Sequence, residues 1–171
     1  RRDVERQVTD AAVRRVEGTG AHADDTAVVV VAGEDWHPGV VGIVAGRLRE
    51  RWRKPVIVIG QDPVTGIGKG SGRSQPGMNL GRAIQAAWEE GVLLAGGGHA
   101  MAAGLTVQGD RIADLTAFLD QRLADGGAGA REPDRGGRRR LGLRERLAPL
   151  AVVAVELAGR PIIAVQSVLR R

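Results

Sequence analysis

Residues 27–59 read AVVVVAGEDWHPGVVGIVAGRLRERWRKPVIVI, and this stretch decides the fold. Two runs rich in β-branched residues, Ala27–Val31 and Pro55–Ile59, have the pattern of strands that are buried on both faces. Between them, residues 39–52 carry apolar residues at helical spacing, and Pro38 marks the helix start because its fixed φ suits the first turn. Strand, helix and strand within about 35 residues predict a right-handed parallel βαβ unit.

The segments next to this unit predict a helix and a strand. Residues 3–17 have apolar residues at helical spacing with charged residues between them, which indicates an amphipathic helix, and Gly18 and Gly20 end it. Val64–Gly72 is rich in glycine and is expected to be a strand or one arm of a hairpin.

Two further helices and one strand are expected towards the C-terminus. Asn79 caps a helix that runs to Glu90 and stops at Gly91, and Ala102–Val107 is the next strand. Asp110 caps the last helix, whose core-facing residues are Ile112, Leu115, Phe118, Leu119 and Leu123. The expected fold is a compact α/β domain with a mixed, partly parallel sheet flanked by helices.

Composition divides the chain into four parts: a connecting helix (1–20), the α/β domain (21–124), a linker (125–140) and a tail (141–171). The linker is rich in Gly and Arg and contains Pro133, which favours disorder, with a basic nucleic-acid-binding segment as the alternative. The tail contains a helical stretch, Leu143–Leu157, and a strand-like run, Pro161–Leu169. Because the chain begins with Arg1, it is expected to be a fragment of a longer protein.

Composition also limits the class of protein. The chain has 171 residues, of which 43% are hydrophobic, but only three Trp and one Phe, so aliphatic side chains must build the core. A row of aromatic residues for base stacking is therefore not available. The absence of cysteine excludes disulfides and thiolate metal sites. No apolar run of 18 residues and no signal peptide occur, which predicts a cytoplasmic protein with no membrane partner.

The net charge of +5 suits a polyanionic partner. Arginine supplies almost all of the positive charge, because Lys54 and Lys69 are the only lysines. A genome that favours arginine codons at solvated positions would give the same balance. Charge alone therefore does not establish nucleic-acid binding.

Two glycine-rich motifs point to chemistry. Residues 96–104, GGGHAMAAG, surround His99 with small residues, so successive N–H groups could converge into an anion-binding nest, although a loose turn is the commoner explanation of such runs. Residues 68–74, GKGSGRS, add the guanidinium of Arg73, which suits a phosphate, and the hydroxyls of Ser71 and Ser74. The alternative for this second motif is a hairpin whose cations face water, and it does not match the Walker P-loop pattern.

A third motif, EDWHPGVVGIVAGR at residues 34–47, completes an ordered set. With GKGSGRS and GGGHAMAAG, it closely resembles the RecJ family of single-strand-specific exonucleases, in the domain that accompanies their catalytic DHH domain. The resemblance runs from about Thr26 to Leu123. It fails in the tail, which lacks the segment that leads the family towards an oligonucleotide-binding barrel; the tail is divergent, truncated or out of frame.

The resemblance implies roles for individual residues. Ser71, Arg73 and Ser74 would hold the DNA phosphate, and the Gly97–Gly98 backbone with His99 would contact the adjoining nucleotide. Trp36 and His37 would line the cleft that faces the catalytic domain, although Trp36 could equally be a core aromatic residue.

The resemblance also implies which parts are missing. The chain has no Asp-His-His sequence, and its three histidines are His22, His37 and His99. A two-metal phosphodiesterase needs clustered carboxylates and histidines. We therefore expect no cofactor on this fragment, a Mg or Mn site in the missing DHH domain, and no activity of the fragment alone.

Three functions are compatible with these motifs. The first is the nucleic-acid-binding domain of a 5′-to-3′ single-stranded-DNA exonuclease, with single-stranded DNA and the DHH domain of the same protein as partners. The second is the substrate domain of an oligoribonucleotide or cyclic-dinucleotide phosphodiesterase, which is not expected to carry the segment from Trp36 to Gly42. The third is a non-catalytic nucleic-acid-binding module, such as the C-terminal domain of alanyl-tRNA synthetases.

Overall fold

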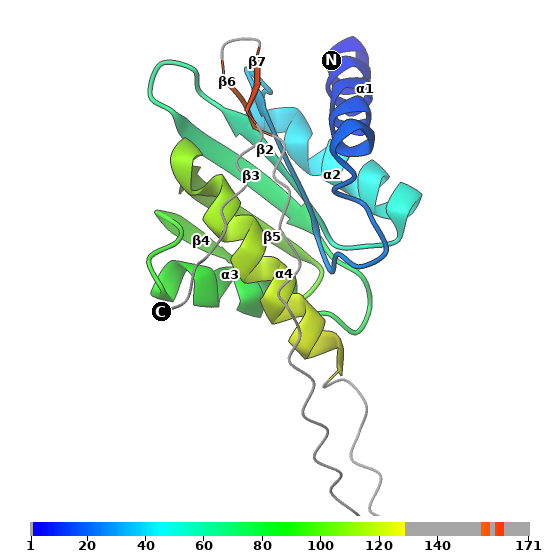
Figure 1. The fold of residues 1–171 in the computed structure, drawn as a ribbon, viewed down its shortest axis with the longest axis vertical. Coiled ribbons are helices and arrows are strands. Elements are labelled where there is room, and N and C mark those ends of the chain that lie inside the picture. The colour runs from blue at the N-terminus through cyan, green and yellow to red at the C-terminus, as the bar shows by residue number, and fades with distance from the viewer. Residues whose placement is uncertain (1, 129–154, 158–159, 163–171) are drawn as a thin grey trace, which may run out of the picture.

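The computed structural model describes residues 2–128, 155–157 and 160–162. A five-stranded sheet in the order β1-β2-β3-β5-β4 lies between two layers of helices (Figure 1). The expected α/β fold with a mixed sheet is confirmed, since β1 and β2 are parallel and every other neighbouring pair in this sheet is antiparallel. Among the described residues, none of the helices is long and apolar enough to cross a membrane.

The βαβ unit forms where the sequence predicts it. β1 (Val29–Glu34) and β2 (Val56–Gln61) pair in parallel over their full length, and α2 (Pro38–Trp52) connects them. Nearly every residue of the two strands is buried, as a central pair with both faces covered requires. His37 caps α2, because its Nδ1 accepts a hydrogen bond of 2.9 Å from the N–H of Gly39.

Alternate residues of β1, with Val28 just before it, enter two separate cores. Val28, Val30 and Ala32 belong to the core under α3 (Leu80–Glu89) and α4 (Ile112–Ala128). The intervening valines belong to the core under α2 and α1 (Arg2–Thr19). The second core takes its strand residues from β1 and β2, whereas the first also extends over β5 (Ala102–Gln108). The α1–α2 layer therefore buries strand side chains at only one end of the sheet.

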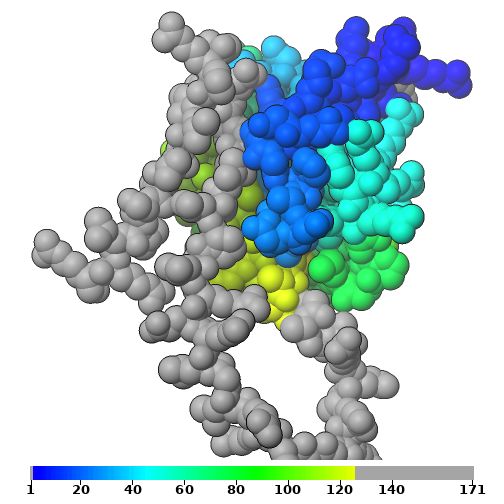
Figure 2. Space-filling view, turned by 45° about the vertical axis from the view of Figure 1, so that its right-hand side comes forward, coloured from blue at the N-terminus to red at the C-terminus, as the bar shows by residue number. Residues whose placement is uncertain are grey.

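α1 packs against the α/β domain. It lies along α2, as the blue and cyan surfaces of Figure 2 show, and buries Val8, Ala12 and Val16. Ion pairs join Glu17 to Arg51, at 2.7 Å, and Glu5 to Arg47. The helix predicted over residues 3–17 is thus present and continues to Thr19.

The glycine-rich motifs form strands. β3 (Ile67–Arg73) is an arm of a hairpin with β2, as one of the expected alternatives had it. The run 96–104 differs from expectation, because its first half is a strand, β4 (Ala95–Gly98), that pairs with β5 in a second hairpin. Glycine carries no strand signal, so β4 comes from pairing with β5 and not from local preference. A short 3₁₀ helix, Gly109–Arg111, leads from β5 into α4.

The C-terminal part differs from the predicted elements. α4 continues to Ala128, so the first residues of the expected linker are helical. β6 (Val155–Leu157) pairs with β7 (Arg160–Ile162), which corrects the end of the helix predicted over Leu143–Leu157. Extended pairing of Val155 opposite Ile162 suits these β-branched residues better than a helix does. The rest of the predicted linker and tail lies outside the described residues.

Gly60 is a position where the fold has no room for a side chain. A Cβ there would lie 1.9 Å from the carbonyl oxygen of Trp36, in the loop between β1 and α2. Gly60→Ala should therefore lower the free energy of unfolding by about 1–3 kcal/mol, the usual cost of overpacking. Urea unfolding of the variant measures this change.

Gly18→Ala is the matched control, because a Cβ at Gly18 meets nothing within 4 Å. It should leave stability unchanged or raise it slightly, since alanine is the better helix former. If the two variants unfold at the same urea concentration, the loop between β1 and α2 does not rest on Gly60.

Candidate nucleic-acid interface

Alternation along β3 separates its glycines from its polar residues. A Cβ at Gly68 would lie 2.6 Å from Ile59, and one at Gly72 would lie 2.6 Å from Leu80, so both glycines face the core under α3 and α4. Successive residues of a strand point to opposite faces. Lys69, Ser71 and Arg73 therefore lie on the other face of the sheet.

The same face continues across β5 and β4. Ser71 is paired with Gly104, which is paired with Gly97, and a Cβ at either glycine would meet nothing within 4 Å. Arg73 is paired with Ala102, and Lys69 with Thr106. These positions form what we call the open sheet face: Lys69, Ser71, Arg73, Gly97, Ala102, Gly104 and Thr106. None of them belongs to either core, and Lys69 and Gly104 are exposed.

α2 forms one side of the open sheet face. A Cβ at Gly42 would lie 3.1 Å from both Arg73 Nη2 and Ser71 Oγ, so the helix comes close to these side chains because it has glycine there. Arg73 Nη1 donates to Ser71 Oγ at 3.1 Å and to the carbonyl of Gly72 at 2.8 Å. The guanidinium is thus held along β3 and is half-buried. It has five N–H donors, and these two hydrogen bonds, both from Nη1, leave donors for a ligand.

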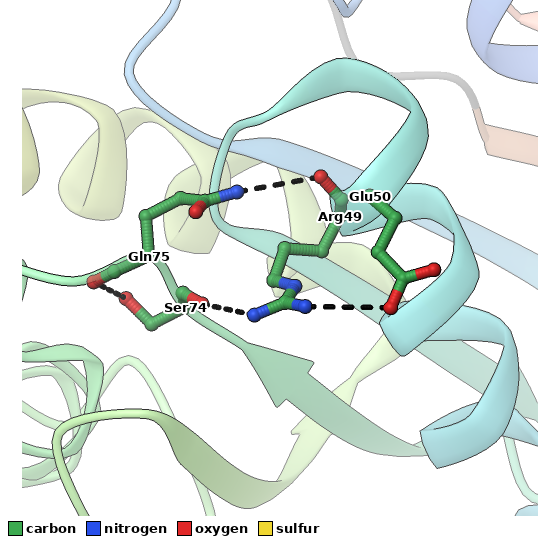
Figure 3. A network of polar contacts seen from close by, with 4 residues as sticks. All are labelled: Arg49, Glu50, Ser74 and Gln75. Atoms are coloured by element: carbon green, nitrogen blue, oxygen red, sulfur yellow. Dashed lines mark hydrogen bonds and ion pairs between the residues drawn. The ribbon is translucent and has the colours of Figure 1, made fainter.

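Ser74 does not share the open sheet face. It is fully buried, and its Oγ donates to the carbonyl of Met78 at 3.2 Å. Figure 3 shows the contacts around it: Arg49 of α2 reaches the carbonyl of Ser74 at 3.5 Å, and Gln75 Nε2 donates to the carbonyl of Arg49 at 3.4 Å. Ser74 therefore ties the end of β3 to α2, and its hydroxyl is not presented to a ligand.

His99 lies at the tip of the β4–β5 hairpin, next to the open sheet face. Its N–H donates to the carbonyl of Ala102 at 2.8 Å, which places it in the same row as Arg73. Its own carbonyl accepts from the N–H of Gly81 at 3.0 Å. The backbone N–H of His99 is therefore used inside the hairpin and does not contribute to the expected anion nest, while its side chain is exposed.

Gly97 and Gly98 have different environments. Gly97 belongs to the floor of the open sheet face, where there is space above it. Gly98 has a φ of +154°, and a Cβ there would lie 2.4 Å from the carbonyl oxygen of Ala102. Gly98 is therefore needed for the shape of the hairpin, which positions Gly97 and His99.

Trp36 and His37 lie in a groove beside the open sheet face. The Trp36 ring rests on Gly33, packs against the core of α1 and α2, and lies 5.4 Å from the guanidinium carbon of Arg15, so it is largely a core aromatic residue. His37 is exposed, and since its Nδ1 accepts from Gly39, its neutral form carries the proton on Nε2. The two residues and Lys69 line a groove of about 630 Å³.

The structure brings together Ser71, Arg73, Gly97 and His99 and separates them from Ser74. Two residues of this site were not predicted from the sequence: Gly42, on α2 beside the open sheet face, and Gly104, within that face. Gly42 has only a weak signal in the sequence, because glycine inside a helix costs about 1 kcal/mol relative to alanine, but Gly46 in the same helix shares this feature and meets nothing within 4 Å. Gly104 lies in the GGGHAMAAG motif, but only the strand register assigns it to a face of the sheet.

The donor set does not fit a metal ion. In the part of the chain that the structure describes, no three His, Asp or Glu side chains come together in a way that could hold one. His22 stacks on Trp52 with 5.7 Å between ring centroids, and His37 caps α2.

Comparison with known proteins places these features in a family. Residues 24–125 match the family model described as the DHHA1 domain. The chain is 42% identical over 119 residues to the single-stranded-DNA-specific exonuclease RecJ of Bacillus subtilis (strain 168), which covers 70% of this chain and 14% of that protein. The chain thus spans about one seventh of the length of this relative.

Solved RecJ structures have a similar fold. The crystal structure of RecJ in complex with Mg²⁺ from Thermus thermophilus matches with a TM-score of 0.58 and 27% identity, over 71% of this chain and 18% of that one. The crystal structure of an exonuclease RecJ bound to manganese matches with a TM-score of 0.57 and 30% identity, over 70% of this chain and 29% of that one. Both relatives were thus crystallised with a divalent metal.

Gly42 offers a test of the interface that does not remove a polar group. Gly42→Ala should stabilise α2 by up to about 1 kcal/mol, yet push the guanidinium of Arg73 away. Moving a side chain off its rotamer costs about 0.5–1.5 kcal/mol, so binding of a single-stranded oligonucleotide should weaken by about two- to tenfold. Thermal unfolding and fluorescence anisotropy measure the two effects.

Gly46→Ala is the matched control one turn further along α2, because a Cβ there meets nothing within 4 Å. It should stabilise the helix and leave binding unchanged. If both variants bind like the wild type, α2 is not a wall of the binding site.

Proposed function

This chain belongs to the DHHA1 domain family, and we propose on that basis that it is the nucleic-acid-binding domain of a RecJ-like 5′-to-3′ single-stranded-DNA exonuclease. Its partners are then single-stranded DNA and the catalytic DHH domain of the same protein, acting in the cytoplasm. The open sheet face is the observation that carries the proposal. It combines the restrained guanidinium of Arg73 and the hydroxyl of Ser71 with a floor that is free of side chains at Gly97 and Gly104.

Phosphate is held by β3 in this proposal. The Arg73 guanidinium is restrained by its hydrogen bonds to Ser71 and to the carbonyl of Gly72, so little rotamer freedom remains to be lost on binding. Guanidinium groups suit phosphate because their planar fork donates two parallel hydrogen bonds. The Ser71 hydroxyl beside it supplies a further donor.

The glycine floor suits a nucleotide that lies flat on the sheet. Gly97 and Gly104 allow sugar or base to approach the peptide planes, and His99 borders this floor at the hairpin tip. No aromatic residue lies on the open sheet face, so stacking on aromatic rings does not contribute. Contacts to phosphate and backbone carry no base information, and binding is therefore independent of sequence.

Hydrolysis belongs to the DHH domain in this proposal. The divalent metal, Mg or Mn, would be bound there and would supply the activated water. This chain captures the strand and presents it to that domain. Incubated alone with Mg²⁺ or Mn²⁺, it should leave a 5′-phosphorylated single strand intact.

Arg73→Ala and His99→Ala should weaken binding in different ways. Loss of a charged hydrogen bond to phosphate costs about 1.5–3 kcal/mol, and one lost phosphate contact should flatten the dependence of log K on log salt by about 0.7 for single strands. His99 is placed beside the nucleotide and not at a phosphate in this proposal, so His99→Ala should lower affinity with little change in that slope. Titrations of an oligothymidylate at several salt concentrations measure both quantities.

Arg122→Ala is the control, because it removes one exposed positive charge from α4, on the opposite side of the sheet. It should change affinity far less than Arg73→Ala. Wild-type affinity of Arg73→Ala at low salt would show that β3 is a solvated hairpin arm and not a phosphate site.

A further inference from the structure

The groove beside the open sheet face is large enough for one nucleotide. Its volume of about 630 Å³ lies within the range of small-molecule sites, about 300–1,000 Å³. The loop between β1 and α2 forms one wall, and the turn between β2 and β3 forms the other. Lys69 lies at the groove and also belongs to the open sheet face.

The first wall is fixed by the backbone. Asp35 has a positive φ of 57°, and its N–H donates to the carbonyl of Gln61 at 3.1 Å. The next residue, Trp36, rests on Gly33 and Gly60, where only glycine leaves room for it. The N–H groups of Gly39 and Val40 at the start of α2 are both satisfied by His37 and are not offered to a ligand.

The second wall is a self-contained turn. The carboxylate of Asp62 accepts hydrogen bonds from the N–H groups of Val64, at 2.8 Å, and Thr65, at 3.1 Å. The hydrogen bonds from Thr65 and Val64 hold the pKa of the Asp62 carboxyl below its usual value. This turn presents Val64 with 92% of its surface exposed, although a valine gains nothing from facing water.

Lys69 connects the groove to the phosphate site. Lys69 and Ser71 are two residues apart on β3, so about 6.5–7 Å separate them along the strand. This distance is close to the spacing of neighbouring phosphates in an extended single strand. A strand with one phosphate at Ser71 and Arg73 would therefore bring its next phosphate to Lys69.

We propose that this groove is a second nucleotide subsite, which takes the base and sugar of the nucleotide next to the one on the open sheet face, with its phosphate at Lys69. The inference rests on the proposed function. The walls of the groove would contact the uncharged base and not a phosphate. The reason is that Asp35 and Asp62 line the groove, and their negative charges would repel a phosphate. Pro63, Val64 and the edge of Trp36 offer the apolar contacts that a base needs.

The subsite predicts how affinity grows with ligand length. NMR titrations of the 171-residue chain should use three probes: 5′-thymidylate, the 5′-phosphorylated thymidine dinucleotide, and that dinucleotide with an abasic second sugar. The intact dinucleotide should bind about fivefold or more tighter than the mononucleotide, roughly 1 kcal/mol. The abasic dinucleotide should lose most of this gain.

Two variants separate the subsite from the open sheet face. Lys69→Ala should weaken binding of the dinucleotide by about two- to fivefold and binding of the mononucleotide by less, because Lys69 lies at the groove end of the open sheet face. His37→Ser keeps an oxygen that caps α2 but removes the ring from the groove, and it should affect binding of the dinucleotide only. Arg122→Ala serves as the charge-matched control.

Three results would overturn the subsite: equal affinities for mononucleotide and dinucleotide, equal affinities for the intact and abasic dinucleotides, or an equal loss for both ligand lengths in Lys69→Ala. Binding of the mononucleotide reports the phosphate site at Ser71 and Arg73. If Arg73→Ala leaves its affinity unchanged, the proposed function fails, and that result is distinct from the failure of the subsite.

Discussion

The alternation of residues along β3 is the constraint on which the site depends. Gly68, Gly70 and Gly72 face a core in which Ile59, Leu105 and Leu80 already fill the space. A slip of one residue in the register of β3 would turn Lys69, Ser71 and Arg73 into that core, and burying unpaired charges is prohibitively unfavourable. The same glycines that complete the core therefore keep the cationic residues on the opposite face.

Glycine also determines how closely the surrounding elements approach the sheet. Gly42 brings α2 against Arg73, Gly60 lets the β1–α2 loop rest on β2, and Gly81 brings α3 within reach of the β4–β5 hairpin, where a Cβ would lie 2.8 Å from the carbonyl oxygens of Gly98 and His99. Each contact joins an element to the backbone or side chains that border the open sheet face. The interface is thus shaped largely by where side chains are missing.

The sequence was sufficient to predict the βαβ unit, because runs of β-branched residues and a proline-initiated helix are strong local signals. It did not predict β4, since three glycines have no strand preference and only the pairing with β5 makes them a strand. Ser74 was expected to hold phosphate with Ser71 and Arg73 because all three lie in the GKGSGRS motif on which the family resemblance rests. Because β3 ends at Arg73, Ser74 instead turns inward to Met78 and the end of α2. The groove between His37 and Val64 forms only because the pairing of β2 with β3 brings separate loops together. No local sequence pattern predicts it.

The most direct test of the open sheet face as the binding site is to map where single-stranded DNA contacts the chain. Amide chemical shifts of the ¹⁵N-labelled protein, followed during titration with a 5′-phosphorylated oligothymidylate, report this residue by residue. If single-stranded DNA binds on the open sheet face, the largest changes fall on Ser71, Arg73, Gly97 and Gly104. Changes confined to the outer surfaces of α1 or α4, with none on the open sheet face, would contradict it.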